Sequence, residues 1–237
     1  MKLDVERSIH EDICGALPDE EFSHIFHLAA FKSVPIGEAL PKEFIINNCW
    51  GTTNLLRKYP NAKIINISSS AANEVRSVYG ATKLFTEMIA SMHKNCLSVR
   101  LYNVFGEGQL PESGALIPSA LSKILSGQPV KIYGDGNQMR DFTYVEDVVK
   151  DLKEVMFEDF RPGVGNIGYG IPISVNDIVF KLFNLMEKEP NFVHLPERDF
   201  DIKKSCAPVD VEADAPEKRN AGLVKTAEWF KNEYSKA

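Results

Sequence analysis

Tyr79 and Lys83 stand four positions apart, shortly after three consecutive serines, Ser68, Ser69 and Ser70. In a helix, two side chains at this spacing lie one turn apart on the same face. An ammonium group beside a phenol favours the ionised phenol, so Lys83 is expected to lower the pKa of Tyr79. Such a phenolate can take the proton of a sugar hydroxyl while hydride leaves the same carbon. A serine at the end of a neighbouring strand could hydrogen-bond the same substrate oxygen.

The same spacing also has an ordinary interpretation, an amphipathic helix with one aromatic side chain and one solvated lysine. A tyrosine and a lysine four positions apart occur often by chance, so this pair alone does not select a function. The rest of the sequence has to decide between the two interpretations.

Composition narrows the class of protein. The 237 residues can form one sizeable core, or one domain with a small lobe, and 44% apolar and 25% charged residues are ordinary globular values. A net charge of -6 without any basic run argues against nucleic-acid binding, and no apolar run is long enough to span a membrane. The first residues contain no signal-peptide core. Four cysteines without metal-ligand spacing indicate a reduced, cytoplasmic-type protein with no metal site, namely Cys14, Cys49, Cys96 and Cys206.

The elements that must position the tyrosine and the serines alternate between strands and helices. Apolar runs predict strands over residues 22–28, 62–67 and 97–104, and helical spacing predicts helices over 41–57 and from Tyr79 to about His93. The first strand ends in the small residues Ala29 and Ala30, which allow close approach to the backbone. Alternation of this kind predicts right-handed βαβ units and a parallel sheet.

The second half of the chain reads as shorter elements. We expect a loop over residues 106–114, a helix over 116–125 and two short strands, 131–133 and 142–145, on either side of a glycine-containing turn. A helix over 147–157, a short strand near 165–170 and a helix that begins at Ser174 follow. The pattern weakens after Pro196 until a last helix, 224–234.

Several polar residues have two interpretations on local grounds. His24 and His27 could be ligands, although histidines beside a strand are more often structural. Asn48 is either solvent-facing or a buried amide with a fixed partner. Arg140 either pairs with Asp141 or a neighbour, or makes a bidentate phosphate contact in a cleft.

Taken together, these segments resemble the extended short-chain dehydrogenase/reductase family, the NAD-dependent sugar-nucleotide epimerases and dehydratases. The resemblance runs from about Phe22 to Val149 and more weakly beyond. It rests on six motifs in the family's order: His27 to Ala30, Asn48 within residues 47–52, the three serines, Tyr79 with Lys83, Val99 to Gly106, and Gly134 to Val148.

The resemblance implies a role for individual residues. Tyr79 corresponds to the family's acid/base, and Lys83 to the residue that lowers its pKa and holds the nicotinamide ribose. Ser69 or Ser70 would bind the reacting sugar oxygen. The cofactor would lie along Ala29, Ala30, Asn48 and Ser68, and the substrate's diphosphate would contact Asn103, Arg140 and Arg198.

Two departures from the family pattern affect these expectations. Residues 29–35 and the short spacing from the serines to Tyr79 look most like the polysaccharide-biosynthesis 4,6-dehydratases, but those carry Thr-Asp-Lys where this chain has Ser69, Ser70 and Ala71. The stretch around Arg140 looks instead like the general epimerases, so the subfamily stays open. The family's opening strand and glycine-rich turn have no counterpart, because Gly15 is the only glycine before Gly37. Since that turn holds the dinucleotide's pyrophosphate, we expect the chain to bind NAD or NADP weakly by itself.

The resulting prediction is an α/β protein, a Rossmann-like parallel sheet lacking its first strands, with a small C-terminal substrate lobe. The Rossmann-like domain is expected over residues 1–110 and about 138–170, and the lobe over 111–137 and 171–237. The predicted chemistry is hydride transfer on a nucleotide-diphosphate sugar. The alternatives are a non-catalytic module that binds a nucleotide sugar or a subunit, and a gene fragment with no independent role.

The missing strands of such a sheet would be central ones. The strand over 22–28 would then have an open edge, which residues 3–5 and the rest of the N-terminal segment, another chain or a loop must cover. We expect a homodimer, through this strand or through the family's usual helices around Asn48 and Tyr79, or a partner that supplies the missing strands.

Overall fold

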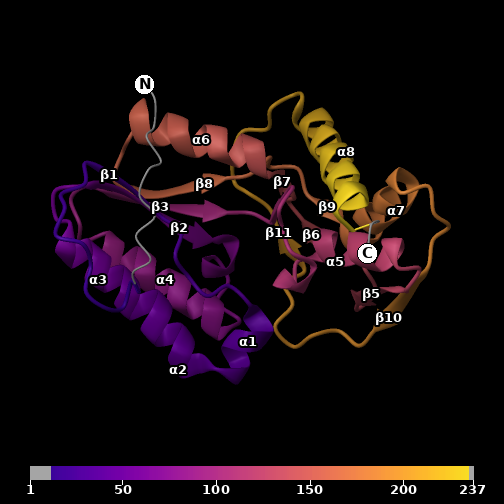
Figure 1. Cartoon of the computed structure of the whole chain (residues 1–237), viewed down its shortest axis with the longest axis horizontal. Helices are drawn as coiled ribbons and strands as arrows, with labels where there is room; N and C mark the ends of the chain where they lie inside the picture. The colour runs from indigo at the N-terminus through magenta and orange to yellow at the C-terminus, as the bar shows by residue number, and fades with distance from the viewer. Residues whose placement is uncertain (1–11, 235–237) are drawn as a thin grey trace.

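The computed structural model describes residues 12–234. A four-stranded parallel sheet forms the centre of the N-terminal half, in the order β1-β2-β3-β8 (Figure 1). Its strands are β1 (His24–His27), β2 (Lys63–Ser69), β3 (Cys96–Leu101) and β8 (Gly163–Ile167). The predicted α/β class and parallel sheet are therefore confirmed.

Helices cover both faces of this sheet. The face toward the bottom of Figure 1 carries α1 (Val34–Ala39), α2 (Pro41–Phe44), a π-helical segment (Ile45–Trp50), α3 (Gly51–Lys58) and α4 (Val78–Ala90), and the other face carries α6 (Val145–Phe157). Neighbouring residues of β2 point into opposite layers: Ile64 packs with Leu55 and Leu56 of α3, and Ile65 packs with Leu152 of α6. Because the middle of β2 is buried on both faces, the neighbouring residues Ile64 and Ile65 are both apolar rather than alternating with polar ones.

β1 lies at the edge of the sheet. Within the described residues it pairs with β2 and with no second strand. Residues 13–18 run along the helices instead, where Trp50 Nε1 donates to Cys14 O (3.2 Å) and Tyr59 OH donates to Pro18 O (2.9 Å). The residues 3–5 that were predicted to join the sheet lie outside the described part of the chain.

The C-terminal half contains small sheets and three helices around the largest apolar cluster. Its sheets pair β10 (Phe192–Leu195) with β5 (Val130–Tyr133), β11 (Lys204–Ser205) and β9 (Ile173–Ser174) with β6 (Met139–Arg140), and β4 (Val104–Phe105) with β7 (Thr143–Tyr144). The helices are α5 (Leu116–Leu125), α7 (Val175–Leu185) and α8 (Ala215–Tyr234).

The start of the last helix was predicted wrongly. α8 begins at Ala215 rather than at Val224. Its first turns are rich in polar residues and contain Gly222, which weaken a helical pattern in the sequence. In the fold, Gly222 packs directly under Tyr144: a Cβ at this position would lie 2.5 Å from the ring. The tertiary contact therefore selects a residue that local propensity disfavours.

Candidate active site

The end of β2 and the start of α4 lie against each other. Ser69 is the last residue of β2, and a 3₁₀ turn (Ser70–Ala72) follows it. α4 is capped by Ser77, whose Oγ accepts from Gly80 N at 3.1 Å. A Cβ on Gly80 would lie 2.6 Å from Ala71 O, so the absence of a side chain lets the helix approach the turn.

Tyr79 faces Ser69 across this contact. The pKa of Tyr79 is raised, because burial of the phenol outweighs the side-chain hydrogen bond with Ser69, which lowers it. Lys83 is buried, and its Nζ donates to Ile67 O at 2.7 Å. The prediction that Lys83 lowers the pKa of Tyr79 is wrong for this structure, because Ser69 is the group that does so.

The side chain of Lys83 is largely shielded from solvent. Burial lowers its pKa to about 8, and the negative charge of Glu87 opposes this decrease. At neutral pH Lys83 is thus mainly charged, but closer to losing its proton than an exposed lysine.

A cavity of about 750 Å³ opens in front of these residues. Most of the predicted site residues line it, namely Ala30, Ser68, Ser69, Ser70, Tyr79, Lys83, Asn103 and Arg198. Asn103 has a φ of 32°, and this left-handed conformation is uncommon for a residue other than glycine and is often found at functional sites. Ala29, Asn48 and Arg140 are not part of this lining.

Asn48 is a buried amide with fixed partners, which decides between its two interpretations. Its Oδ1 accepts from Phe31 N (2.8 Å), and its Nδ2 donates to Phe31 O (3.0 Å) and to Thr82 Oγ1 (3.0 Å). The side chain thereby ties the loop after β1 to α4. It supports one wall of the cavity rather than facing it.

The two histidines of β1 differ. His24 is exposed, and His27 is buried with its Nε2 2.8 Å from Thr52 Oγ1. Thr52 Oγ1 donates to Asn48 O (2.7 Å), so His27 is the donor in its own contact with Thr52. Burial, and to a lesser extent the charge of Lys83, lowers the pKa of His27 to about 4. His27 is therefore a neutral structural residue, and residues 12–234 contain no group of three potential metal ligands.

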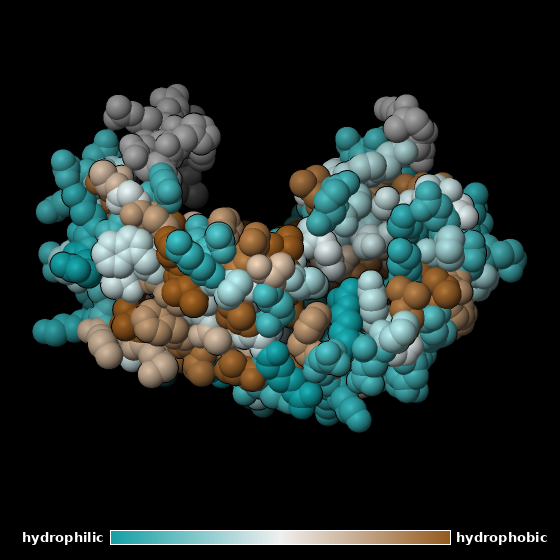
Figure 2. Space-filling view, turned by 90° about the horizontal axis from the view of Figure 1, so that it is seen from below, coloured by the Kyte–Doolittle hydropathy of each residue, from teal (hydrophilic) through white to brown (hydrophobic). Residues whose placement is uncertain are grey.

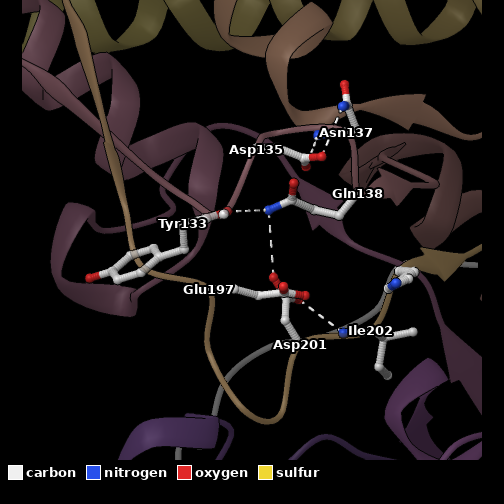
Figure 3. A pocket seen from close by; sticks show the side chains of 9 residues that line it. Tyr133, Asp135, Asn137, Gln138, Glu197, Asp201 and Ile202 are labelled. Atoms are coloured by element: carbon white, nitrogen blue, oxygen red, sulfur yellow. Dashed lines mark hydrogen bonds between the residues drawn. The ribbon is translucent and has the colours of Figure 1, made fainter.

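A second cavity, of about 280 Å³, lies in the C-terminal half (Figure 3). Figure 3 shows Gln138 pointing at Asp201, and the Gln138 Nε2 also donates to Tyr133 O at 2.8 Å. Arg198 lines the larger cavity and places its guanidinium 3.5 Å from the centre of the Tyr133 ring, which lines the smaller one. Arg198 and Tyr133 thus lie between the two cavities.

Arg140 pairs with Asp201, not with its neighbour Asp141. Both members of this pair are largely buried, with side-chain exposures of 14% and 21%. Asp141 is fully buried instead, and its Oδ2 accepts from Gly170 N (2.8 Å) and Ala207 N (3.1 Å). The pair holds the Arg140 guanidinium beside the smaller cavity.

Sequence reasoning missed three acidic residues at the site: Glu87, Glu107 and Asp201. Glu107 lines the larger cavity and accepts a hydrogen bond from Tyr144 OH (2.9 Å). Glu87 had a usable signal, because it lies four residues after Lys83 on the same helix face. Asp201 had none, since its partner Arg140 is distant in the sequence.

Comparison with known proteins agrees with this geometry. Residues 4–168 match the family model described as "NAD dependent epimerase/dehydratase family". The chain belongs to this family. The family predicted from the sequence is therefore confirmed. Its members are NAD-dependent enzymes, so the predicted class of chemistry is confirmed as well.

Individual members cover most of the chain. A UDP-glucuronate 4-epimerase of Thermodesulfobacterium geofontis is 28% identical, over 88% of this chain and 72% of its own. The UDP-N-acetylglucosamine 4-epimerase of Methanobrevibacter ruminantium M1, solved with UDP-N-acetylmuramic acid, is 31% identical with a TM-score of 0.83, over 95% of this chain and 83% of its own. MoeE5, solved with UDP-glucose and NAD, is 29% identical with a TM-score of 0.78, over 89% of this chain and 79% of its own.

The relatives include epimerases and dehydratases of sugar nucleotides, and this chain belongs to the same class of enzymes. Within residues 12–234, every helix is too short or too polar to cross a bilayer.

Proposed function

We propose that this protein binds a nucleotide-diphosphate sugar across its two neighbouring cavities and oxidises or reduces a sugar carbon with NAD. The observation that carries the proposal is that Tyr79, Ser69 and Lys83 meet in the larger cavity, which Arg198 also lines. The sugar would lie beside Tyr79, and the nucleotide would extend toward Tyr133 and Asp201. The names of the relatives support a UDP-sugar.

The roles of the site residues follow from their chemistry. With its pKa raised, Tyr79 is protonated near neutral pH, the form that donates a proton to a keto oxygen of the sugar. In the opposite direction its phenolate accepts the hydroxyl proton. Ser69, in hydrogen-bond contact with Tyr79, would hold the same sugar oxygen, and Ser70 beside it lines the cavity.

The residues around Lys83 fit the nicotinamide end of NAD. An ammonium group has three N–H donors, and Ile67 O takes one of those of Lys83, so the others are free for ribose hydroxyls. Ala30 and Ser68 line the same part of the cavity and would lie along the cofactor, as would the neighbouring Ala29. When bound, NAD supplies the hydride acceptor. NADP in place of NAD is the alternative cofactor.

The two arginines would bind the diphosphate. Arg198 already lies over the ring of Tyr133, and Arg140 is held by Asp201, so both guanidinium groups have a protein partner before a ligand arrives. Planar guanidinium groups suit phosphate oxygens because they can donate two parallel hydrogen bonds. Asn103 would contribute a further polar contact.

We also propose a homodimer, formed through the helices on one face of the sheet. The exposed apolar side chains there are Ile36, Leu40, Ile45, Ile46, Trp50, Phe85, Met88 and Met92. Figure 2 views this side of the molecule and shows brown side chains gathered over the half that the helices form. An apolar surface of this extent on a polar background is typical of an interface.

The predicted division into domains and the cytoplasmic location remain part of this proposal. The largest apolar cluster draws on α5, α7 and α8, which supports a separate substrate lobe over 111–137 and 171–237, beside a Rossmann-like domain over 1–110 and about 138–170. All four cysteines are free thiols, as expected in a reducing compartment.

The test combines binding and turnover. The chain is incubated with UDP-glucose, UDP-glucuronic acid or UDP-N-acetylglucosamine and NAD, and products are identified by NMR. Tyr79→Phe should abolish conversion without weakening substrate binding, whereas Tyr234→Phe, on α8, should leave it unchanged. Conversion at the wild-type rate by Tyr79→Phe excludes the proposed acid/base.

The same assay distinguishes an enzyme from the alternative, a non-catalytic module that binds a nucleotide sugar. In that case calorimetry finds UDP-sugar binding and NMR finds no product. For the diphosphate site, Arg140→Ala should raise the Kd for the UDP-sugar at least about tenfold, because a charge-assisted contact contributes about 1.5–3 kcal/mol. The exposed Arg161→Ala is the control.

A further inference from the structure

Glu107 is the only acid among the described residues that line the larger cavity. The basic residues of the same lining are Lys32, Lys83 and Arg198. The cavity therefore has basic side chains that attract the phosphates of a nucleotide and one acidic side chain that repels them. A part of the ligand without negative charge is expected beside Glu107, and in a nucleotide sugar that part is the sugar.

The loop that carries Glu107 follows a strand that ends beside the serines of the site. β3 ends at Leu101, which pairs in register with Ser69 at the end of β2. The chain then continues along the cavity, and residues 103–109 all line it. Glu107 therefore belongs to a wall of the cavity that begins next to the serine proposed to hold the reacting sugar oxygen.

Two contacts hold Glu107 in this wall. β4 pairs with β7 so that Phe105 lies beside Tyr144, and the Tyr144 OH lies 2.9 Å and 3.0 Å from the two carboxylate oxygens of Glu107. A Cβ on Gly106 would overlap the side chain of Val145, so the backbone just before Glu107 packs directly on the start of α6. The carboxylate therefore has a defined position before a ligand binds.

Within residues 12–234, no ion pair neutralises the charge of Glu107. The ammonium of Lys225 lies 5.3 Å from the centre of the Tyr144 ring, but it pairs with Glu146 at 2.8 Å. A carboxylate can accept about four hydrogen bonds, and in the described chain Glu107 accepts from Tyr144 OH alone. Acceptor positions therefore remain for hydroxyl groups of a ligand.

We propose that Glu107 determines which sugar the cavity accepts: a nucleotide-diphosphate sugar with an uncharged sugar ring, and not a uronic acid. The hydroxyl groups of a neutral sugar can donate hydrogen bonds to the carboxylate of Glu107. The carboxylate of a uronic acid cannot donate one, and its charge has the same sign. This specificity rests on the proposed function, because it requires the sugar to lie in the larger cavity.

UDP-glucose and UDP-glucuronic acid are a matched pair of probes for this specificity. They differ only in one group of the sugar, a hydroxymethyl group in the first and a carboxylate in the second. Calorimetry at neutral pH, without cofactor, measures the Kd of each for the full chain. UDP-glucuronic acid should bind at least about tenfold more weakly, because two like charges are brought together. Equal affinity of the wild-type protein for both overturns the proposal.

Glu107→Gln removes the charge and keeps the size of the side chain and an oxygen acceptor for Tyr144 OH. The ratio of the two Kd values should fall at least about fivefold, mainly because UDP-glucuronic acid binds more tightly. Glu112→Gln makes the same change on an exposed side chain of the same loop, outside the cavity lining, and should keep the wild-type ratio. A folded Glu107→Gln protein with the wild-type ratio overturns the proposal.

A second ligand comparison tests the same charge without any variant. UDP-glucuronamide carries a neutral carboxamide of nearly the same size in place of the carboxylate, so the wild-type protein should bind it at least about tenfold more tightly than UDP-glucuronic acid. Equal affinities for the amide and the acid overturn the role of Glu107 and leave the proposed function intact. If none of the three nucleotide sugars binds, the specificity and the proposed function are both refuted.

Discussion

At the scale of single residues, the site depends on which polar groups the protein itself already satisfies. Asn48 uses its amide on Phe31 and Thr82, and His27 donates to Thr52, so neither faces the cavity as a ligand. Tyr79 and Lys83 do line it. Polar side chains near the site therefore either support its walls or face the cavity, depending on whether the protein itself already satisfies their hydrogen bonds.

The buried His27 makes a pH-dependent contribution to stability. Its pKa is about 4 in the folded protein against 6.5 for an unperturbed histidine, so between these values the unfolded chain binds a proton that the folded chain does not. Stability contributed by neutral His27 is complete above pH 6.5 and is lost as the pH falls toward 4. The loss amounts to about 3 kcal/mol.

Urea unfolding at pH 7 and at pH 4.5 measures this effect. His27→Gln should lose less free energy of unfolding between the two pH values than the wild type does. His24→Gln, at the exposed end of β1, should behave as the wild type. Equal pH dependence of all three proteins contradicts the assignment.

At the scale of elements, the junction between β2 and α4 sets the geometry of the site. A turn of three residues and the first turn of α4 touch at Ala71 and Gly80, and this contact brings Tyr79 to Ser69. Helix propensity alone favours alanine over glycine by about 1 kcal/mol. The close approach of the two backbones opposes that preference.

Gly80→Ala should destabilise the protein, by about 1–3 kcal/mol, because its Cβ would lie 2.6 Å from Ala71 O and a backbone atom must move. Turnover should decrease as well, since Tyr79 precedes the displaced residue. The matched control is Gly165→Ala in β8, whose Cβ would find ordinary contact, 3.8 Å from Leu97. Unchanged urea midpoints in Gly80→Ala would mean that the turn yields without strain.

A second prediction at the scale of elements concerns the edge strand β1 and its pairing with another chain. An apolar edge strand tends to pair with another chain. If β1 does so, the amides of residues 24–28 that face away from β2 should exchange slowly with deuterium at high protein concentration and quickly after dilution. Fast exchange at every concentration refutes pairing through this edge.

At the scale of the whole molecule, two structural halves lie side by side, with the parallel sheet in one and the small sheets in the other (Figure 1). Arg198, from the segment after β10, lines the cavity that begins at β2. The site therefore needs both halves, and the apolar helical face lies on the half with the parallel sheet.

Met88→Glu should convert the proposed dimer into monomers, because it places a charge on that face, where Met88 is 58% exposed. Light scattering after size-exclusion chromatography measures the mass. Val149→Glu is the control, on α6 across the sheet and 49% exposed. A wild-type protein that is already monomeric refutes the dimer.

Cofactor affinity is the other prediction for the whole chain. The 237 residues contain no glycine-rich turn to hold a pyrophosphate, and the residues proposed above to hold NAD lie around Lys83, where the nicotinamide end would bind. Calorimetry should therefore find weak binding of NAD(H) to this chain, with a Kd well above the micromolar range. Micromolar affinity contradicts the expectation and requires another pyrophosphate site.

The sequence by itself determined the α/β class, the parallel sheet, the family and the cluster formed by Tyr79, Lys83 and the serines. These features depend on local spacing and on apolar runs, which can be read directly along the chain. The tertiary structure alone decided that Arg140 pairs with Asp201, that α8 begins at Ala215 and that Ser69, rather than Lys83, lowers the pKa of Tyr79. Each of these depends on burial or on a contact between distant segments, and the periodicity of a sequence contains neither.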